Sequence, residues 1–172
     1  MLDETPRYNY RRYPLHAGGD AVTRAGKDAV WRVVSAIGGD NRYYAMNGLW
    51  TIREWLDSAV GGPGRRRGRP LGRPIKAGDH IDSWRVRVAD APTLLALEFG
   101  MKAPGCGVLE FSIAPVVSGT QVTATAFWNP DGIAGQIYWM AMMPAHLVLF
   151  KRLTGEICRR AEQTHLDERF YT

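Results

Sequence analysis

The stretch DSWRVRV at residues 82–88, followed by LLALEFGM at residues 94–101, decides the fold. Apolar side chains recur at every second position in both, which is the period of a β-strand with one buried face. Two further runs, at residues 108–114 and 121–128, show the same period, and turn residues separate all four runs. Short connections between such strands predict antiparallel hairpins rather than a parallel sheet with helical crossovers.

The same alternation predicts which residues pair across the hairpins. If Trp84 and Val86 point inward, the neighbouring strands must pair so that their own apolar positions also point inward. The predicted inner pairs are Trp84 with Phe99, Val86 with Leu97 and Val88 with Leu95; Phe99 with Leu109, Leu97 with Phe111 and Leu95 with Ile113; and Leu109 with Ala126, Phe111 with Ala124 and Ile113 with Val122. The alanines on the last strand would leave space for a closing helix or for a ligand.

On the outer face, this register places two carboxylates side by side. Arg85 lies beside Glu98, Glu98 beside Glu110, and Glu110 beside Thr125. Two close carboxylates could act as an acid/base pair, because like charges push their pKa values apart. Their outward position beside arginines favours a solvated row of ion pairs instead.

Helical spacing of apolar residues predicts three helices. They cover residues 29–37, residues 49–60, and a long closing segment from about 133 to about 163. Residues 21–24 are predicted to form a short strand before the first helix. The order of elements is therefore a strand, two helices, an antiparallel meander and a long C-terminal helix.

The length and composition indicate one globular domain. The chain has 172 residues, of which 45% are hydrophobic and 23% charged, and this excludes disorder and disulfide scaffolds. We expect an N-terminal arm at residues 1–20 that wraps the domain or dangles, the domain at residues 21–165, and a tail at residues 166–172.

The net charge of +5 comes from one segment. Six basic residues and no acid lie between residues 63 and 78; without them 16 basic residues face 17 acidic ones, a net charge of −1. Nucleic-acid binders usually spread positive charge over a wider groove, so a nucleic-acid partner is disfavoured. The candidate residues for an anion or an acidic partner are Arg65, Arg66, Arg67 and Arg69.

Cysteine usage and the N-terminus predict a cytoplasmic protein. Only Cys106 and Cys158 are present, and the first 25 residues hold no apolar run typical of a signal peptide. No metal is expected, because Asp79, His80 and Asp82 lack an obvious third or fourth ligand partner.

One uncharged stretch, residues 132–150, approaches the length that spans a bilayer. Gln136, Pro144 and His146 within it favour a buried helix of a folded domain, and no transmembrane span is expected.

A string of short motifs resembles an uncharacterised bacterial family across about residues 28–160. That family belongs to the START-like, polyketide-cyclase-like superfamily, also called SRPBCC, and its members also occur fused behind an epimerase-like, NAD(P)-binding domain. The motifs are Val30–Gly39, Tyr43-Tyr44, Leu49-Trp50, Leu56-Asp57, Val60–Gly62, Gly78-Asp79, Trp84–Val86, Met101-Lys102-x-Pro104-Gly105, Leu109–Phe111, Phe127-x-Asn129-Pro130-x-Gly132, Tyr138-Trp139 and Pro144-x-His146.

The resemblance implies the helix-grip fold of the α+β class. In it an antiparallel sheet of about six to seven strands wraps around a long C-terminal helix, with two shorter helices after the first strand. Superfamily relatives hold hydrophobic small molecules between sheet and helix, and some are cyclases, dehydratases or hydrolases. No nucleotide-binding half is present here, so no cofactor is expected.

We therefore expect a hydrophobic or amphipathic small molecule to bind between the sheet and the closing helix. Two alternatives remain: an enzyme that uses the same cavity with His146 as the candidate catalytic residue, and an interaction protein that uses the arginine-rich loop to bind nucleic acid or an anionic surface. A homodimer also remains open. The expected lining residues are Tyr43, Tyr44, Trp50, Trp84, Phe99, Phe111, Trp128, Tyr138, Met142 and His146.

Overall fold

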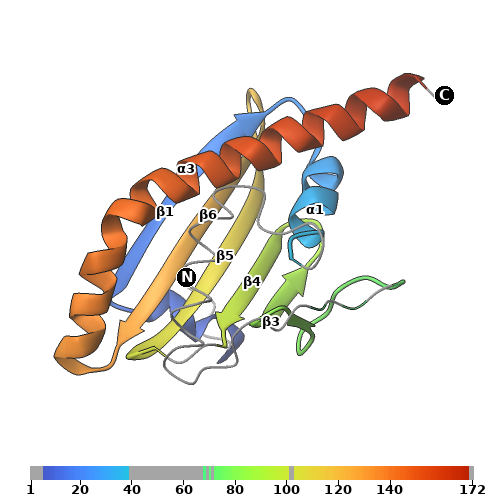
Figure 1. The fold of residues 1–172 in the computed structure, drawn as a ribbon. Helices are drawn as coiled ribbons and strands as arrows, with labels where there is room; N and C mark the ends of the chain where they lie inside the picture. Colours follow the sequence, from blue (N-terminus) through green and yellow to red (C-terminus); the bar gives the residue numbers. More distant parts are fainter. Residues whose placement is uncertain (1–5, 39–67, 69, 71, 101–102, 171–172) are drawn as a thin grey trace.

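The computed structural model describes residues 6–38, 68, 70, 72–100 and 103–170, and it forms one antiparallel sheet crossed by a long helix (Figure 1). The strands lie in the order β1-β6-β5-β4-β3-β2. The elements are η1 (Pro6–Arg12), β1 (Leu15–Thr23), α1 (Lys27–Ser35), β2 (His80–Ile81), β3 (Trp84–Asp90), β4 (Leu94–Phe99), β5 (Gly105–Val116), β6 (Gly119–Pro130) and α3 (Gly132–Phe170).

This architecture confirms the predicted helix-grip fold, with six strands in the sheet. The long helix α3 packs on β1 and β6, and α1 packs against α3 at the far end of the sheet (Figure 1). The second predicted helix, at residues 49–60, lies outside the described residues.

Strand β1 starts at Leu15, well before the predicted residues 21–24. The middle of the strand, Ala17-Gly18-Gly19, has no large apolar residue, and α3 crosses the strand there at close range. A Cβ atom on Gly19 would lie 3.0 Å from the backbone nitrogen of Lys151 and 3.1 Å from the carbonyl carbon of Phe150. Only a residue without a side chain lets the two backbones approach this closely.

The predicted hairpin registers hold in part. Between β5 and β6 all three predicted inner pairs are confirmed. Between β3 and β4 the predicted pairs of Trp84 and Val86 are also confirmed, but Val88 lies opposite Ala96 rather than Leu95. A β-bulge between Val86 and Val88 adds one residue to β3, so Val88 turns to the outer face.

The predicted register between β4 and β5 is wrong by two residues. Leu97 lies opposite Leu109, Leu95 opposite Phe111, and Glu98 opposite Val108. A shift by two positions keeps every side chain on its own face, so the apolar pattern cannot detect it. Glu98 and Glu110 are therefore not cross-strand neighbours.

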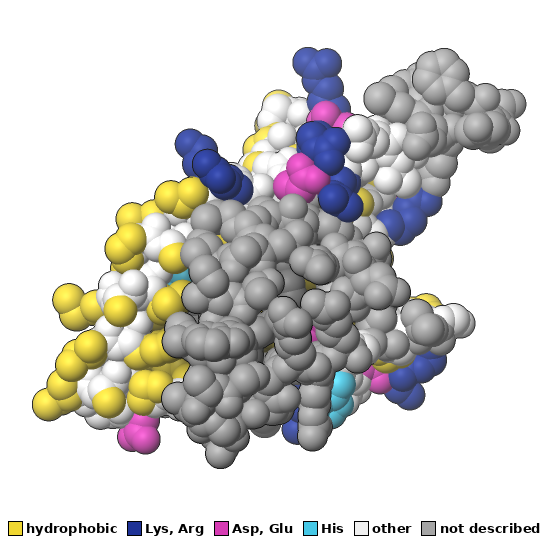
Figure 2. Space-filling model, in the orientation of Figure 1, with side chains coloured by type: hydrophobic (Ala, Val, Ile, Leu, Met, Phe, Trp, Pro, Cys, Tyr) yellow, Lys and Arg dark blue, Asp and Glu magenta, His cyan; other side chains and the backbone are white. Residues whose placement is uncertain are grey.

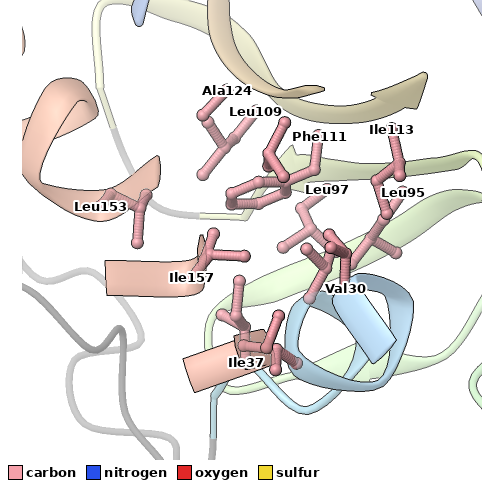
Figure 3. Packing of buried hydrophobic residues seen from close by; sticks show 14 of the residues in the cluster. Val30, Ile37, Leu95, Leu97, Leu109, Phe111, Ile113, Ala124, Leu153 and Ile157 are labelled. Atoms are coloured by element: carbon pink, nitrogen blue, oxygen red, sulfur yellow. The ribbon is translucent and has the colours of Figure 1, made fainter. Parts of the chain in front are cut away.

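The main core fills the half of the inner face that lies near α1. Val30 and Ile37 from the α1 region, Leu95 and Phe111 from the sheet, and Ile157 from α3 are all buried there (Figure 3). Small Ala124 on β6 makes room for α3 over this core. The large residues of β4 and β5 thus form the sheet side of the core, and the small residues of β1 and β6 leave space for the helix α3.

Residues 8–13 of the expected N-terminal arm pack against the outer face of the sheet around Glu110. Tyr10 is fully buried and donates a short hydrogen bond to Glu110 Oε2, and Arg11 Nε donates to the same oxygen at 2.8 Å. Burial and then the bond to the carboxylate raise the pKa of Tyr10 above its usual value. The expected solvated row is thus wrong for Glu110, which is buried, while Glu98 accepts a hydrogen bond from Arg87 at 3.2 Å.

Candidate functional site

A partly open pocket of about 80 Å³ lies between the sheet and the first half of α3. It lies at the end of the sheet opposite α1, where β4 ends and β5 begins. Almost all of its wall is apolar. The described lining residues are Trp84, Phe99, Gly107, Val108, Leu109, Ala126, Phe127, Trp128, Tyr138, Trp139, Met142, Ala145, His146, Leu149 and Phe150.

Trp128 on β6 joins the sheet to the helix in this pocket. Its indole lies over Gly107 of β5, where a Cβ atom would be 2.8 Å from the ring carbon Cε3. Its Nε1 donates a hydrogen bond to the carbonyl oxygen of Gly135 at 3.2 Å. The single polar atom of the indole is therefore satisfied by α3, which leaves an apolar ring face for the pocket.

A continuous series of aromatic contacts runs across the site. On the sheet side, the ring centroids of Trp84 and Phe99 are 5.6 Å apart and those of Phe99 and Trp128 are 5.9 Å apart. On the helix side, Trp128 lies 5.3 Å from Tyr138 and 6.5 Å from Trp139. These spacings are those of edge-to-face and stacked aromatic pairs, so the wall presents both ring faces and ring edges.

His146 brings a titratable ring into this wall. Its ring centroid is 4.8 Å from that of Trp139 and 5.3 Å from that of Phe150, and its Nδ1 atom is shielded from solvent. An imidazole between two aromatic rings has a fixed position and can donate or accept one hydrogen bond at the pocket. Tyr138 contributes a phenolic hydroxyl to the lining, which can donate or accept a hydrogen bond.

The structure brings together six of the predicted ligand-binding residues: Trp84, Phe99, Trp128, Tyr138, Met142 and His146 all line the pocket. Phe111 instead lies in the core beside Leu153 and Ile157 (Figure 3). The predicted residues Tyr43, Tyr44, Trp50, Arg65, Arg66, Arg67 and Arg69 lie outside the described part of the chain.

On α3, sequence reasoning missed Trp139, Ala145, Leu149 and Phe150 as lining residues, and on the strands it missed Gly107, Val108, Leu109, Ala126 and Phe127. The residues on α3 lie one, seven, eleven and twelve positions after Tyr138, the spacing of a helix stripe that also contains Met142 and His146. The four residues on α3 could have been found by adding the helix positions that neighbour Tyr138, Met142 and His146 on the same side.

The acidic residues near His80 are engaged in local contacts. Both carboxylate oxygens of Asp79 accept hydrogen bonds from Arg73, at 2.7 and 2.8 Å. These bonds, with the one from the Lys76 backbone, lower the pKa of Asp79 to about 2. Among the described residues no group of three or more His, Cys, Asp or Glu could hold a metal ion.

An antiparallel sheet that holds one long C-terminal helix, with an apolar pocket between them, defines a helix-grip protein. The chain belongs to the family described as "Protein of unknown function (DUF2867)", whose model matches residues 19–153. The likeness to a family that also occurs fused behind an epimerase-like domain stays a prediction.

Solved structures are similar to this chain at low sequence identity. Protein NE0264 from Nitrosomonas europaea is 12% identical with a TM-score of 0.51, covering 87% of this chain and 96% of that one. The Zhui aromatase/cyclase from Streptomyces sp. R1128 is 14% identical with a TM-score of 0.47, covering 87% of this chain and 94% of that one. No curated protein matches the chain.

Proposed function

We propose that the protein binds a hydrophobic or amphipathic small molecule in the pocket between the sheet and α3. The observation that carries this proposal is the lining, in which aromatic and aliphatic side chains surround the space and two groups, His146 and Tyr138, can form hydrogen bonds. Ligand pockets in proteins combine an apolar wall with a few placed polar groups in this way.

The lining also defines the kind of ligand. Ring faces from Trp128 and Trp139 favour an apolar body that is flat or unsaturated, because aromatic pairs stack or meet edge to face. His146 and Tyr138 both belong to α3, so a polar group of the ligand would lie at the helix side. We expect its apolar body to lie against the sheet.

The size of the pocket sets a further condition. A volume of about 80 Å³ is smaller than the roughly 300 Å³ or more of sites for drug-sized ligands. A ligand of that size requires side chains such as Met142 to change rotamer or the first half of α3 to move. Met142 is suited to this role, because its unbranched side chain adapts to irregular spaces.

The two cysteines fit a cytoplasmic setting, which we include in the proposal. Both are free; Cys106 is exposed and Cys158 is buried. Burial raises the pKa of the Cys158 thiol to about 11, so this thiol stays protonated and unreactive at neutral pH.

The experiment compares two substitutions on the same helix. Ala145→Phe places a ring inside the pocket, whereas Ala141→Phe places the same ring on the exposed side of α3. Native mass spectrometry of gently purified protein and displacement of an uncharged hydrophobic dye measure binding. We expect a bound mass or a displaceable dye in the unmodified protein, binding at least about tenfold weaker in Ala145→Phe, and unchanged binding in Ala141→Phe.

Two results would contradict the proposal. One is that neither a bound mass nor dye displacement is observed for the unmodified protein. The other is that both phenylalanine variants, folded by circular dichroism, bind the dye as the unmodified protein does.

A further inference from the structure

The outer side of the first half of α3 exposes large apolar side chains. We call the residues Ile133, Ile137, Met140, Ala141, Pro144, Leu147 and Val148 the outer ridge. Their spacing of three and four residues places them on one side of a helix. Figure 2 shows hydrophobic side chains gathered along the left side of the molecule, where this part of α3 lies. The exposed fractions are 74% for Ile133, 62% for Ile137, 72% for Met140, 67% for Leu147 and 44% for Val148.

The charged residues that continue this side of the helix are basic. Between Asp131 and Lys151 the sequence contains no charged residue. Lys151 and Arg152 are both exposed and follow Val148 by three and four positions, so they continue the stripe of the outer ridge. An apolar stripe that is continued by basic residues is typical of helices that lie in the interface of an anionic membrane.

The opposite side of the helix faces the sheet and is buried. Trp139, Leu149 and Phe150 are buried and line the pocket or the core. By length and composition α3 is the one helix in the described part of the chain that could cross a membrane, with 22% of the relevant window buried. A crossing would require this inner side to leave the sheet, whereas docking by the outer ridge leaves the fold intact.

The shape of the ridge favours lipid over a second copy of the chain. The helix contains Pro144 and bends as it crosses the sheet, with its outer side convex (Figure 1). Two convex ridges touch only near their highest point and would leave Ile133 and Val148 exposed. Lipid acyl chains adapt to a convex surface and can cover the whole ridge.

We propose that the outer ridge docks on an anionic phospholipid bilayer. Its apolar side chains enter the boundary between headgroups and acyl chains, and Lys151 and Arg152 contact the anionic headgroups. The docking side and the pocket lie on opposite sides of the same helix half, so a hydrophobic ligand could pass from the bilayer to the pocket by a short path. The docking itself depends on the outer ridge and not on whether the pocket holds a ligand.

The test measures co-sedimentation of the full chain with phosphatidylcholine vesicles, with and without phosphatidylserine. We expect binding to the anionic vesicles that weakens with added salt, because salt screens exposed charges. Each basic residue near an anionic surface contributes about fivefold in affinity, so Lys151→Gln/Arg152→Gln should bind about 30-fold more weakly. Ile137→Ser/Met140→Ser/Leu147→Ser should lose binding at least about tenfold, because each change removes apolar carbons from the interface.

Val117→Ser provides the matched control, since Val117 is a fully exposed apolar residue in the turn between β5 and β6. It should bind vesicles like the unmodified protein. The proposal is overturned if the unmodified protein ignores anionic vesicles, or if the ridge variant, still folded by its thermal melt, binds them unchanged. Sedimentation velocity tests whether a second copy of the chain covers the outer ridge instead. If the protein does not bind vesicles and forms a dimer that the ridge substitutions dissociate, the outer ridge is a dimer interface and the proposal is overturned.

Discussion

The hydrogen bond between Tyr10 and Glu110 should account for a measurable part of the stability. The carboxylate of Glu110 is buried on the outer face of the sheet and accepts bonds from Tyr10 and Arg11. Tyr10→Phe removes one of these donors and retains the ring, which packs edge to face with Phe127 at 5.5 Å. The substitution therefore tests the bond and not the packing.

The magnitude follows from the burial of the charge. A hydrogen bond to a charged group contributes about 1.5–3 kcal/mol to stability. Because Arg11 still contacts the same oxygen at 2.8 Å, we expect a loss in the lower part of that range, about 2 kcal/mol. For a domain of this length, this corresponds to a fall in Tm of roughly 4–8 °C.

Urea denaturation of Tyr10→Phe, Glu110→Gln and the double variant measures the coupling between the two side chains. We expect a coupling free energy of about 1 kcal/mol or more, since the two groups share one bond. Tyr8→Phe is the control: its hydroxyl donates to Asp90 Oδ2 at 2.7 Å in a part-buried setting, so the loss should be below about 1 kcal/mol. A loss below about 0.5 kcal/mol for Tyr10→Phe, with additive effects in the double variant, would refute the role assigned to this bond.

Three further predictions concern pH, packing and the pocket. Burial and the contact with Cys106 raise the pKa of Tyr13 to about 12. The contribution of Tyr13 to stability is therefore complete below the unfolded pKa of about 10 and is lost as pH rises towards 12. Tyr13→Phe should flatten this part of the curve of unfolding free energy against pH. Gly19→Ala should destabilise the protein by about 1–3 kcal/mol in urea denaturation, because the new Cβ atom would meet the α3 backbone. Gly155→Ala, with nothing within 4 Å of its Cβ position, should stabilise it by about 0.5–1 kcal/mol. Equal effects of the two substitutions would contradict the close approach at Gly19. His146→Phe should change the affinity for an uncharged hydrophobic dye by no more than about twofold, and it should weaken the binding of a probe with a polar head at least about fivefold. The opposite order of effects would show that His146 is not the polar contact.

The fold could be predicted from the sequence because its signals are local. Alternation at residues 82–88 and 94–101 marks strands, and the confirmed pairs Trp84 with Phe99, Val86 with Leu97 and Phe111 with Ala124 follow from parity together with the positions of the turns. The bulge after Val86 and the two-residue shift of β5 could not be predicted, since they depend on a local kink and on the geometry of the loop before Gly105. Both leave an apolar pattern that reads equally well in the wrong register.

The role of Glu110 could not be predicted for a related reason. A carboxylate on the outer face of a sheet is usually solvated, and the residues that bury it come from the arm about 100 positions earlier. The arm itself shows no helical or strand period, so nothing in residues 8–13 indicates where it packs. Such contacts between distant segments are visible only once the strands are placed.

The uncharged stretch at residues 132–150 shows why mean hydropathy is a poor guide to what a helix does. The sequence favoured a buried helix, but only one side of α3 is buried. The inner side carries the aromatic residues Tyr138, Trp139 and Phe150, which line the pocket, whereas the outer ridge carries exposed aliphatic residues and methionine. Aromatic residues pack against the aromatic wall of the sheet, and flexible aliphatic ones suit a fluid environment, so the two sides of the helix differ in their chemistry. That difference, rather than the length of the apolar run, distinguishes a helix with one buried side from a helix that crosses a membrane.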